Sequence, residues 1–231
     1  MIRFEGVSKR YGDFTAVDDL SFSVEEGETV VLIGPSGCGK TTSLRMVNRM
    51  IEPSEGRILV EEKSVGSFEP EALRRRIGYV IQSVGLFPHM TVRENIAIVP
   101  KLLKWETRRR NERAEELLKM VGLEPSSYAE KRPDELSGGE AQRIGVARAL
   151  AADPPLLLMD EPFGAVDPLN RETLQVEFNR LQNKLRKTVI FVTHDLDEAI
   201  RVGDRIILMK EGRLVQEDRP EKLLAEPVND F

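Results

Sequence analysis

The sequence predicts an α/β fold with three parts: an N-terminal antiparallel β region, a mainly parallel sheet covered by helices, and an α-helical subdomain inserted into that core. Short apolar runs at 29–33, 77–81, 156–159 and 188–192 alternate with helical segments, which is typical of parallel β/α units. Between 82 and 152 no comparable run occurs and helix signals replace it. The alternation and its interruption together predict this fold class.

The first 33 residues are expected to form short strands separated by glycine turns. Further along, 42–50 contains neither Gly nor Pro and is expected to be a helix, and 221–225 is the last predicted helix. The predicted strands lie at 2–7, 20–24, 29–33, 77–81, 156–159 and 188–192.

The interval after 82 carries successive helix signals. Thr91 followed by Glu94 has the spacing of a capping box, 107–121 has helical character, and another helix is expected after Ser137. We therefore predict one domain over 1–231, with a catalytic core formed by 1–84 and 154–231 and a helical subdomain formed by 85–153.

Composition excludes several classes of protein. Cys38 is the only cysteine, so no disulfide is expected. The net charge of −5 argues against nucleic-acid partners and against binding to anionic membranes. No apolar stretch approaches the ~20 residues of a membrane span, and residues 1–5 lack the layout of a signal peptide. The chain is therefore expected in the cytoplasm.

Residues 34–41 have the pattern G-x-x-x-x-G-K-T between a predicted strand and a predicted helix. The glycines let backbone N–H groups turn toward phosphate oxygens, and the helix N-terminus adds partial positive charge. Lys40 can reach the β- and γ-phosphates, and the Thr41 hydroxyl can coordinate Mg²⁺. The core is therefore predicted to be a P-loop NTPase. The loop consists of Gly34, Pro35, Ser36, Gly37, Cys38, Gly39, Lys40 and Thr41.

Polar residues directly follow three other predicted strands: Gln82, the pair Asp160 and Glu161, and His194. Ligands of open parallel sheets bind beyond the carboxyl ends of the strands, so these residues should share one rim with the loop. Asp160 is placed to hold Mg²⁺, and Glu161 to orient and deprotonate a water. His194 should face the γ-phosphate. The rim is predicted to be a nucleotide-hydrolysis site.

A second glycine cluster, Leu136-Ser137-Gly138-Gly139-Glu140, precedes the helical run 141–152. It could form another anion-binding helix N-terminus, yet the first loop already wraps the phosphates of one nucleotide. The cluster is therefore expected to serve a nucleotide held by another subunit. A plain helix N-cap is the alternative.

These motifs resemble those of the ATP-binding subunit of ABC transporters, over essentially the whole chain. Residues 34–42 are similar to the family's Walker A motif, 156–161 to its Walker B motif with the catalytic glutamate, and 136–140 to its signature motif. Such an order of motifs implies that ATP and Mg²⁺ are bound.

The remaining motifs also match in order. Gln82 resembles the Q-loop residue and His194 the H-switch, and both are implied to take part in catalysis. Asp167, within 165–167, is similar to the D-loop residue that borders the nucleotide.

The resemblance implies particular contacts with the nucleotide. Tyr11 would stack on adenine, Thr42 would contact the α-phosphate, and Gln82 would add a ligand to Mg²⁺. Ser137 and Gly139 would contact the γ-phosphate across a head-to-tail homodimer. Without the resemblance, Tyr11 would be interpreted as a packing residue.

Residues 76–92, 94–96 and 99–103, supported by 163–168, are similar to importers of osmoprotectants such as glycine betaine, carnitine and choline. This resemblance implies a subunit that hydrolyses ATP to energise uptake. Its partners would be transmembrane permease subunits and, indirectly, an extracytoplasmic substrate-binding protein, so the chain would lie on the inner face of the membrane.

Two features depart from the pattern. Glu140 stands where the signature motif usually has Gln, which adds negative charge near the composite site. Many of these importer subunits also continue into a tandem CBS regulatory region, whereas this sequence ends at Phe231.

Of three alternative functions, two differ from this one in features that the sequence shows. A soluble ABC ATPase acting on DNA would have a long coiled coil between Gln82 and Leu136, and one acting on ribosomes would have two ATPase units. A small-molecule kinase with a P-loop leaves 137–140 unexplained. An importer of another small solute, such as an amino acid, stays open because this subunit need not touch the solute.

Residues 85–88, Gly-Leu-Phe-Pro, place apolar side chains in a predicted loop beside Gln82. A loop gains nothing by exposing such side chains to water, so the segment is predicted to contact a permease subunit.

Overall fold

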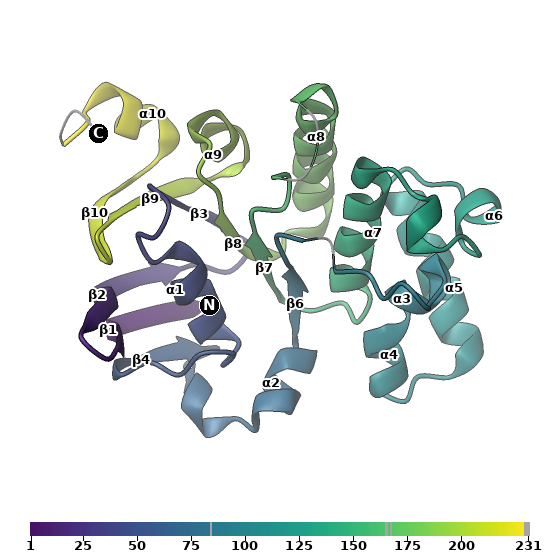
Figure 1. Cartoon of the computed structure of the whole chain (residues 1–231), viewed down its shortest axis with the longest axis horizontal. Coiled ribbons are helices and arrows are strands. Elements are labelled where there is room, and N and C mark those ends of the chain that lie inside the picture. The colour runs from purple at the N-terminus through teal and green to yellow at the C-terminus, as the bar shows by residue number, and fades with distance from the viewer. Residues whose placement is uncertain (84, 165, 167, 229–231) are drawn as a thin grey trace. The chain divides into compact units, whose positions relative to one another are not determined.

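The computed structural model describes residues 1–83, 85–164, 166 and 168–228 (Figure 1). By compactness the chain divides into a first unit, Met1–Arg74 with Arg186–Phe231, and a second unit, Arg75–Leu185. The second unit thus extends beyond the predicted helical interval 85–153. It also includes the strands Ile77–Val80 and Leu156–Asp160, which pair with each other, and the helix Gly138–Leu150 contacts the first of them.

The first unit begins with an antiparallel sheet, as predicted. Its strands run in the order β2-β1-β4-β5, and every pair of neighbours is antiparallel. Phe4 and Phe22 stack at 4.3 Å between ring centroids on the buried face, which fixes the register of the first two strands. The bounds are β1 Ile2–Tyr11, β2 Phe14–Val24, β4 Glu55–Val60 and β5 Lys63–Ser64.

The other sheet strands of this unit run in the order β10-β9-β3-β8. β3 (Thr29–Ile33) pairs in parallel with β8 (Thr188–Val192) and with β9 (Arg205–Lys210), and β10 (Arg213–Asp218) is antiparallel to β9. All residues of β3 and β8 are buried, as expected for strands covered on both faces. The helices of this unit are α1 Lys40–Val47, α9 Leu196–Val202 and α10 Pro220–Ala225, and the 3₁₀ turn is η1 Val65–Ser67.

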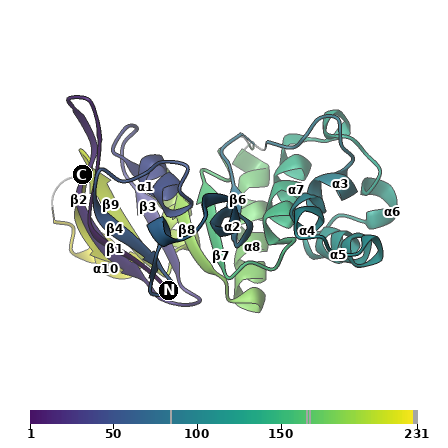
Figure 2. The same cartoon turned by 90° about the horizontal axis from the view of Figure 1, so that it is seen from below.

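The second unit contains two parallel strands, β6 (Ile77–Val80) and β7 (Leu156–Asp160), and a group of helices (Figure 2). Helix α7 (Gly138–Leu150) packs against α3, α5 and β6 and supplies buried residues such as Ile144 and Ala147. Between 85 and 153 the described residues form no strand, in line with the predicted helical interval. The other elements are α3 Val92–Ile96, α4 Ile98–Leu102, α5 Thr107–Met120, α6 Pro125–Tyr128, η2 Pro133–Glu135 and α8 Pro168–Leu185, while α2 Pro70–Arg75 ends at the boundary between the units.

The structure confirms the α/β fold class and corrects some element boundaries. The helix predicted over 42–50 is α1, which begins at Lys40 because Gly39 is its N-cap and ends at Val47, before the C-cap Asn48. Strands β4, β5, β9 and β10 were not predicted. Among the described residues, no helix combines the length and the apolar character needed to cross a bilayer.

Candidate active site

The predicted phosphate loop joins β3 to α1 in the first unit. The Lys40 side chain is buried, and its ammonium donates hydrogen bonds to the carbonyl oxygens of Gly34 (2.6 Å) and Pro35 (3.0 Å). These bonds hold the cation beneath the loop. Ser36 and Gly37 are exposed, so this part of the loop presents its backbone to solvent.

Two glycines give the loop its shape. Gly39 has a φ of 102°, and a Cβ at this position would lie 2.5 Å from the carbonyl oxygen of Ala16. A Cβ on Gly34 would overlap the carbonyl oxygen of Met209 on β9. Because Gly39 has no side chain to cap α1, the first N–H groups of that helix point toward the loop without a side-chain acceptor from the N-cap. Such a helix start is suited to bind an anion.

His194 lies beside this loop through strand register. β3 and β8 pair in parallel, with Leu32 opposite Val192, so the loop and His194 both follow carboxyl ends of adjacent strands. The backbone there is fixed because Thr193 donates its N–H to Leu32 and accepts the N–H of Asp195 on its hydroxyl. The His194 side chain is exposed.

Tyr11 ends β1 at the turn into β2 and exposes 48% of its surface. The Lys9 ammonium lies 4.9 Å from the centre of its ring. Tyr11 is therefore only half covered by the chain, and this phenol at a hairpin tip retains exposed surface for stacking. Its contact with adenine remains a prediction.

In the second unit, Gln82, Asp160 and Glu161 lie together at the carboxyl ends of β6 and β7. The strands pair in parallel with Val80 opposite Met159, and the Gln82 amide donates to a carboxylate oxygen of Glu161 at 3.0 Å. Glu161 has a φ of 45°, a left-handed conformation unusual for a residue with a side chain. The contact with the Gln82 amide orients the Glu161 carboxylate.

Asp160 is 1% exposed at the end of β7, and the Tyr79 hydroxyl donates to it at 3.4 Å. No group of three His, Cys, Asp or Glu side chains within the described ranges could hold a metal ion. Mg²⁺ on a nucleotide does not need such a group, because one carboxylate, a hydroxyl, phosphate oxygens and waters satisfy it. The oxygen donors Asp160 and Thr41 are of the right chemical type.

The predicted signature segment forms the start of α7. Ser137 is the N-cap, and it shares a reciprocal capping box with Glu140: the Ser137 hydroxyl accepts the Glu140 N–H (3.3 Å) and a Glu140 carboxylate oxygen accepts the Ser137 N–H (2.7 Å). A Cβ on Gly139 would meet no atom within 4 Å. Ser137 and Gly138 are exposed, which leaves the segment open to a ligand or partner. Asp167 and Ala165 of the predicted D-loop lie outside the described residues.

Sequence reasoning missed the role of Asn95, which is fully buried on α3. Its amide nitrogen donates to the carbonyl oxygens of Phe87, Met90 and Thr91 at 3.0 to 3.2 Å, and its amide oxygen accepts the Phe87 N–H at 2.7 Å. Asn95 thus folds the loop that leaves Phe87 40% exposed. A buried polar side chain with four such bonds is characteristic of a loop whose shape matters.

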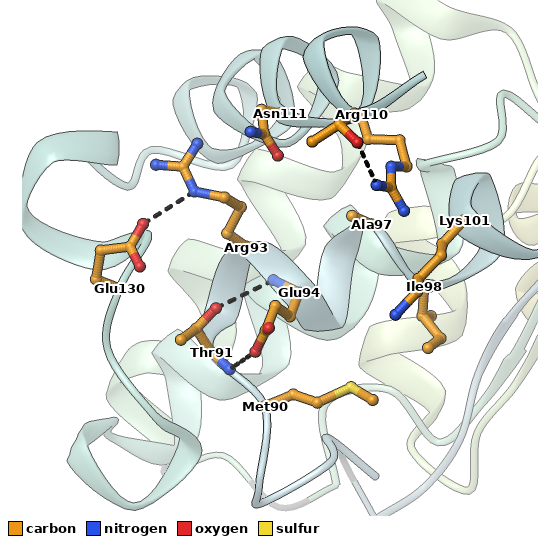
Figure 3. Close-up of a pocket in the computed structure, with 11 residues that line it drawn as sticks. Met90, Thr91, Arg93, Glu94, Ala97, Ile98, Lys101, Arg110, Asn111 and Glu130 are labelled. Carbon is orange, nitrogen blue, oxygen red and sulfur yellow. Dashed lines mark hydrogen bonds and ion pairs between the residues drawn. The ribbon is translucent and has the colours of Figure 1, made fainter. Parts of the chain in front are cut away.

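A hollow of about 330 Å³ lies elsewhere in the second unit, among α3, α4 and α5 (Figure 3). Arg93 on its wall donates to Glu130 at 2.9 Å, and Glu94 is held by the capping box with Thr91. None of the described residues that line this hollow is a predicted nucleotide-binding residue. The candidate active site therefore does not coincide with this hollow.

Comparison with known proteins points to one family. The ABC transporter family model matches residues 17–164. The chain is 56% identical to the carnitine transport ATP-binding protein OpuCA of Listeria monocytogenes and 55% identical to the glycine betaine/carnitine/choline transport ATP-binding protein OpuCA of Bacillus subtilis, in both cases over 100% of the chain. The alignments cover 58% and 61% of those relatives, so the chain spans about three fifths of their length.

A solved structure gives the same result for the fold. The dimeric, post-hydrolysis ATP-binding cassette MJ0796, bound to ADP and Pi, is 34% identical to this chain and superimposes with a TM-score of 0.84. The match covers 95% of this chain and 99% of the cassette.

Proposed function

Because this chain belongs to the ABC transporter family, we propose that it binds and hydrolyses ATP and so energises an importer of a quaternary-amine osmoprotectant of the glycine betaine, carnitine or choline type. The observation that carries the hydrolytic part is the Glu161 carboxylate, oriented by the Gln82 amide at 3.0 Å and adjacent in sequence to a buried aspartate. That arrangement suits the activation of a water rather than the binding of an anion.

Binding would rest on the phosphate loop of the first unit. Lys40 and the backbone N–H groups of the loop would bind the phosphates, Thr42 would contact the α-phosphate, and Tyr11 would stack on adenine. Mg²⁺ would be held by Thr41, Asp160 and Gln82, and it would neutralise negative charge on the phosphates. The loop supports this proposal because its ammonium and N–H groups provide donors to an anion.

Hydrolysis would use Glu161 as the general base. As the water oxygen bonds to the γ-phosphorus and the bond to the bridging oxygen breaks, Glu161 would accept a proton from that water. His194 would donate a hydrogen bond to the γ-phosphate. The signature residues Ser137, Gly138, Gly139 and Glu140 would complete the site of a partner subunit in a head-to-tail homodimer, with Asp167 beside it.

The importer part of the proposal is supported by the names of the relatives, which transport carnitine or the set glycine betaine, carnitine and choline. Such a task requires transmembrane permease subunits, and indirectly a substrate-binding protein outside the cell. The chain would then lie in the cytoplasm, peripheral to the inner face of the membrane.

The loop 85–88 is the proposed contact with the permeases. Asn95 and Arg148 build it: Arg148 donates to the carbonyl oxygen of Gly85 at 2.6 Å, while Asn95 holds Phe87 through its backbone. The Phe87 ring packs edge-on against His89, at 6.0 Å between centroids, and remains partly exposed. A fixed loop that holds an aromatic ring in solvent is suited to fill a partner's pocket.

The test uses the chain reconstituted with its permeases in vesicles. Phe87→Asp should leave the ATPase activity of the isolated chain nearly unchanged, but should abolish permease docking and the uptake of betaine or choline, because a charged group cannot enter an apolar pocket. The control is Val176→Asp, which alters another exposed apolar side chain of the second unit. Docking and uptake that survive Phe87→Asp would move the contact elsewhere. Uptake of only an unrelated solute would contradict the osmoprotectant assignment.

A further inference from the structure

Glu140, which departs from the usual signature pattern, is held by a tyrosine on a different helix. The hydroxyl of Tyr128, at the end of α6, donates to carboxylate oxygen Oε1 of Glu140 at 2.5 Å. The other carboxylate oxygen, Oε2, accepts the N–H of Ser137 at 2.7 Å. Glu140 thus links Tyr128 to the N-cap of α7 through two separate oxygens.

The hydrogen bonds between Glu140 and Ser137 determine which donor of Ser137 remains available to a ligand. The Ser137 hydroxyl oxygen already accepts the N–H of Glu140 at 3.3 Å, so the hydroxyl hydrogen must point away from that N–H. Ser137 is exposed, and this hydrogen is therefore directed where an external acceptor could receive it. The Glu140 carboxylate holds the backbone N–H of Ser137, and so it fixes the backbone from which the hydroxyl extends.

A capping box of this kind does not by itself require a tyrosine. On α3, Thr91 and Glu94 form the same reciprocal pair, with distances of 2.8 and 3.2 Å. The signature segment differs because its Glu also accepts a phenol hydroxyl from α6. The hydrogen bond from Tyr128 is therefore not needed to form the capping box at the start of α7.

We propose that Tyr128 is a positioning residue for the signature segment: through Glu140 it holds the Ser137 hydroxyl and the N–H groups of Gly138 and Gly139 ready for the γ-phosphate of a nucleotide bound by a partner subunit. This inference rests on the proposed ATP hydrolysis by a dimer. It identifies a residue outside the signature segment that controls the segment's geometry.

The protonation states suit this role. The Tyr128 hydrogen bond, followed by the Ser137 N–H, lowers the pKa of Glu140 to about 2, so the carboxylate stays ionised near neutral pH. The same hydrogen bond raises the pKa of Tyr128, which keeps its proton. The Lys131 ammonium lies 4.2 Å from the centre of the Tyr128 ring, and its positive charge also lowers the pKa of Glu140.

The chemistry also explains how Gln could serve at position 140. A Gln could accept the Ser137 N–H on its carbonyl and donate its amide N–H to the Tyr128 oxygen, because a phenol hydroxyl both donates and accepts. Alanine could do neither. The proposal therefore predicts that Glu140→Gln loses less activity than Glu140→Ala.

The test compares Tyr128→Phe, Glu140→Ala, Glu140→Gln and the double variant Tyr128→Phe with Glu140→Ala, all in the full chain. The matched control is Glu94→Gln, in the capping box that lacks a tyrosine. Equilibrium dialysis gives ATP affinity, phosphate release gives kcat and KM, and thermal unfolding checks the fold.

Tyr128→Phe should lower kcat by about tenfold, the effect of losing one hydrogen bond to a charged group, while ATP affinity of the isolated subunit stays unchanged. Glu140→Ala should lower kcat about as much, and Glu140→Gln should lower it less than Glu140→Ala does. The Glu94→Gln control should change kcat little. The double variant should be no slower than either single variant, because the two residues act as a unit.

A normal kcat in Tyr128→Phe, or losses that multiply in the double variant, would overturn the inference and leave the proposed function intact. Absence of ATP hydrolysis in the wild-type chain would instead overturn the proposed function, and the inference with it. If Tyr128→Phe unfolds at the assay temperature, the contrast between Glu140→Gln and Glu140→Ala decides: equal activity of these two variants would contradict the proposal.

Discussion

In the first unit the predicted nucleotide-binding groups are an ammonium and backbone N–H groups, whereas in the second unit they are mainly carboxylates. Lys40 and the phosphate loop supply donors and positive charge, and Asp160, Glu161 and Glu140 supply acceptors and negative charge. A triphosphate is attracted to the former and repelled by the latter. The difference predicts that most of the affinity for ATP resides in the first unit and that the general base resides in the second.

The two glycine-rich helix starts show the same contrast. At α1 the N-cap is Gly39, which contributes no side chain, so the helix N–H groups remain directed at the loop. At α7 the N-cap Ser137 and the acidic Glu140 satisfy each other's N–H groups within the chain. The N-terminus of α1 is therefore suited to surround an anion. The N-terminus of α7 offers few N–H donors, and they lie beside the negative charge of Glu140. The α7 N-terminus is thus suited to complete a site rather than to form one.

The largest expected effect comes from Glu161→Gln, which removes the base and leaves the groups of the first unit unchanged. Hydrolysis should slow by about 10²–10⁴-fold, the usual contribution of a positioned general base, while ATP binding persists and ATP traps a stable dimer. The assay is phosphate release at saturating Mg-ATP, and Glu62→Gln, a surface carboxylate paired with Arg3 at 3.2 Å, is the control. Turnover near that of the wild type would remove Glu161 from the role of base.

Lys40→Ala should have a smaller effect, and it should act on nucleotide affinity rather than on the rate of the chemical step. It removes the cation from the first unit, so nucleotide affinity should fall by about 10–100-fold, as expected for losing a charge-assisted hydrogen bond. Equilibrium dialysis measures it, with Lys101→Ala, an exposed lysine of the second unit, as the control. Unchanged ATP affinity would contradict the assignment of Lys40 and the division of tasks between the units.

Runs of apolar residues in the sequence correctly predicted those strands in which every side chain is buried. β3 and β8 are entirely buried, so their apolar runs were recognisable, and the capping box at Thr91 and Glu94 is confirmed because it depends on residues three apart. β9 was missed although Ile206–Met209 is apolar and Gly212 marks the turn after it. β4 begins with exposed Glu55, Gly56 and Arg57 and gives no such signal.

Site residues could be predicted where they are consecutive in the sequence. They could not be predicted where the fold brings together segments that are distant in the sequence. The phosphate loop and the pair at 160–161 could be recognised from their flanking strands. The four hydrogen bonds of Asn95 arise only when the chain folds back over α3. The bond from Tyr128 to Glu140 likewise joins two helices with no periodic relation, so no sequence pattern could have revealed it.

Mixing two inactive variants tests most directly whether the first unit of one subunit works with the signature segment of another. Ser137→Arg blocks the signature segment, and Lys40→Ala weakens nucleotide binding. At an ATP concentration well below the Kd of Lys40→Ala, each variant alone should therefore show almost no ATPase activity. A mixed dimer contains one intact pair, Lys40 from one chain and Ser137 from the other, and it should recover partial ATPase activity. Absence of recovery in verified mixed dimers, or hydrolysis at the wild-type rate by a strictly monomeric protein, would contradict the account.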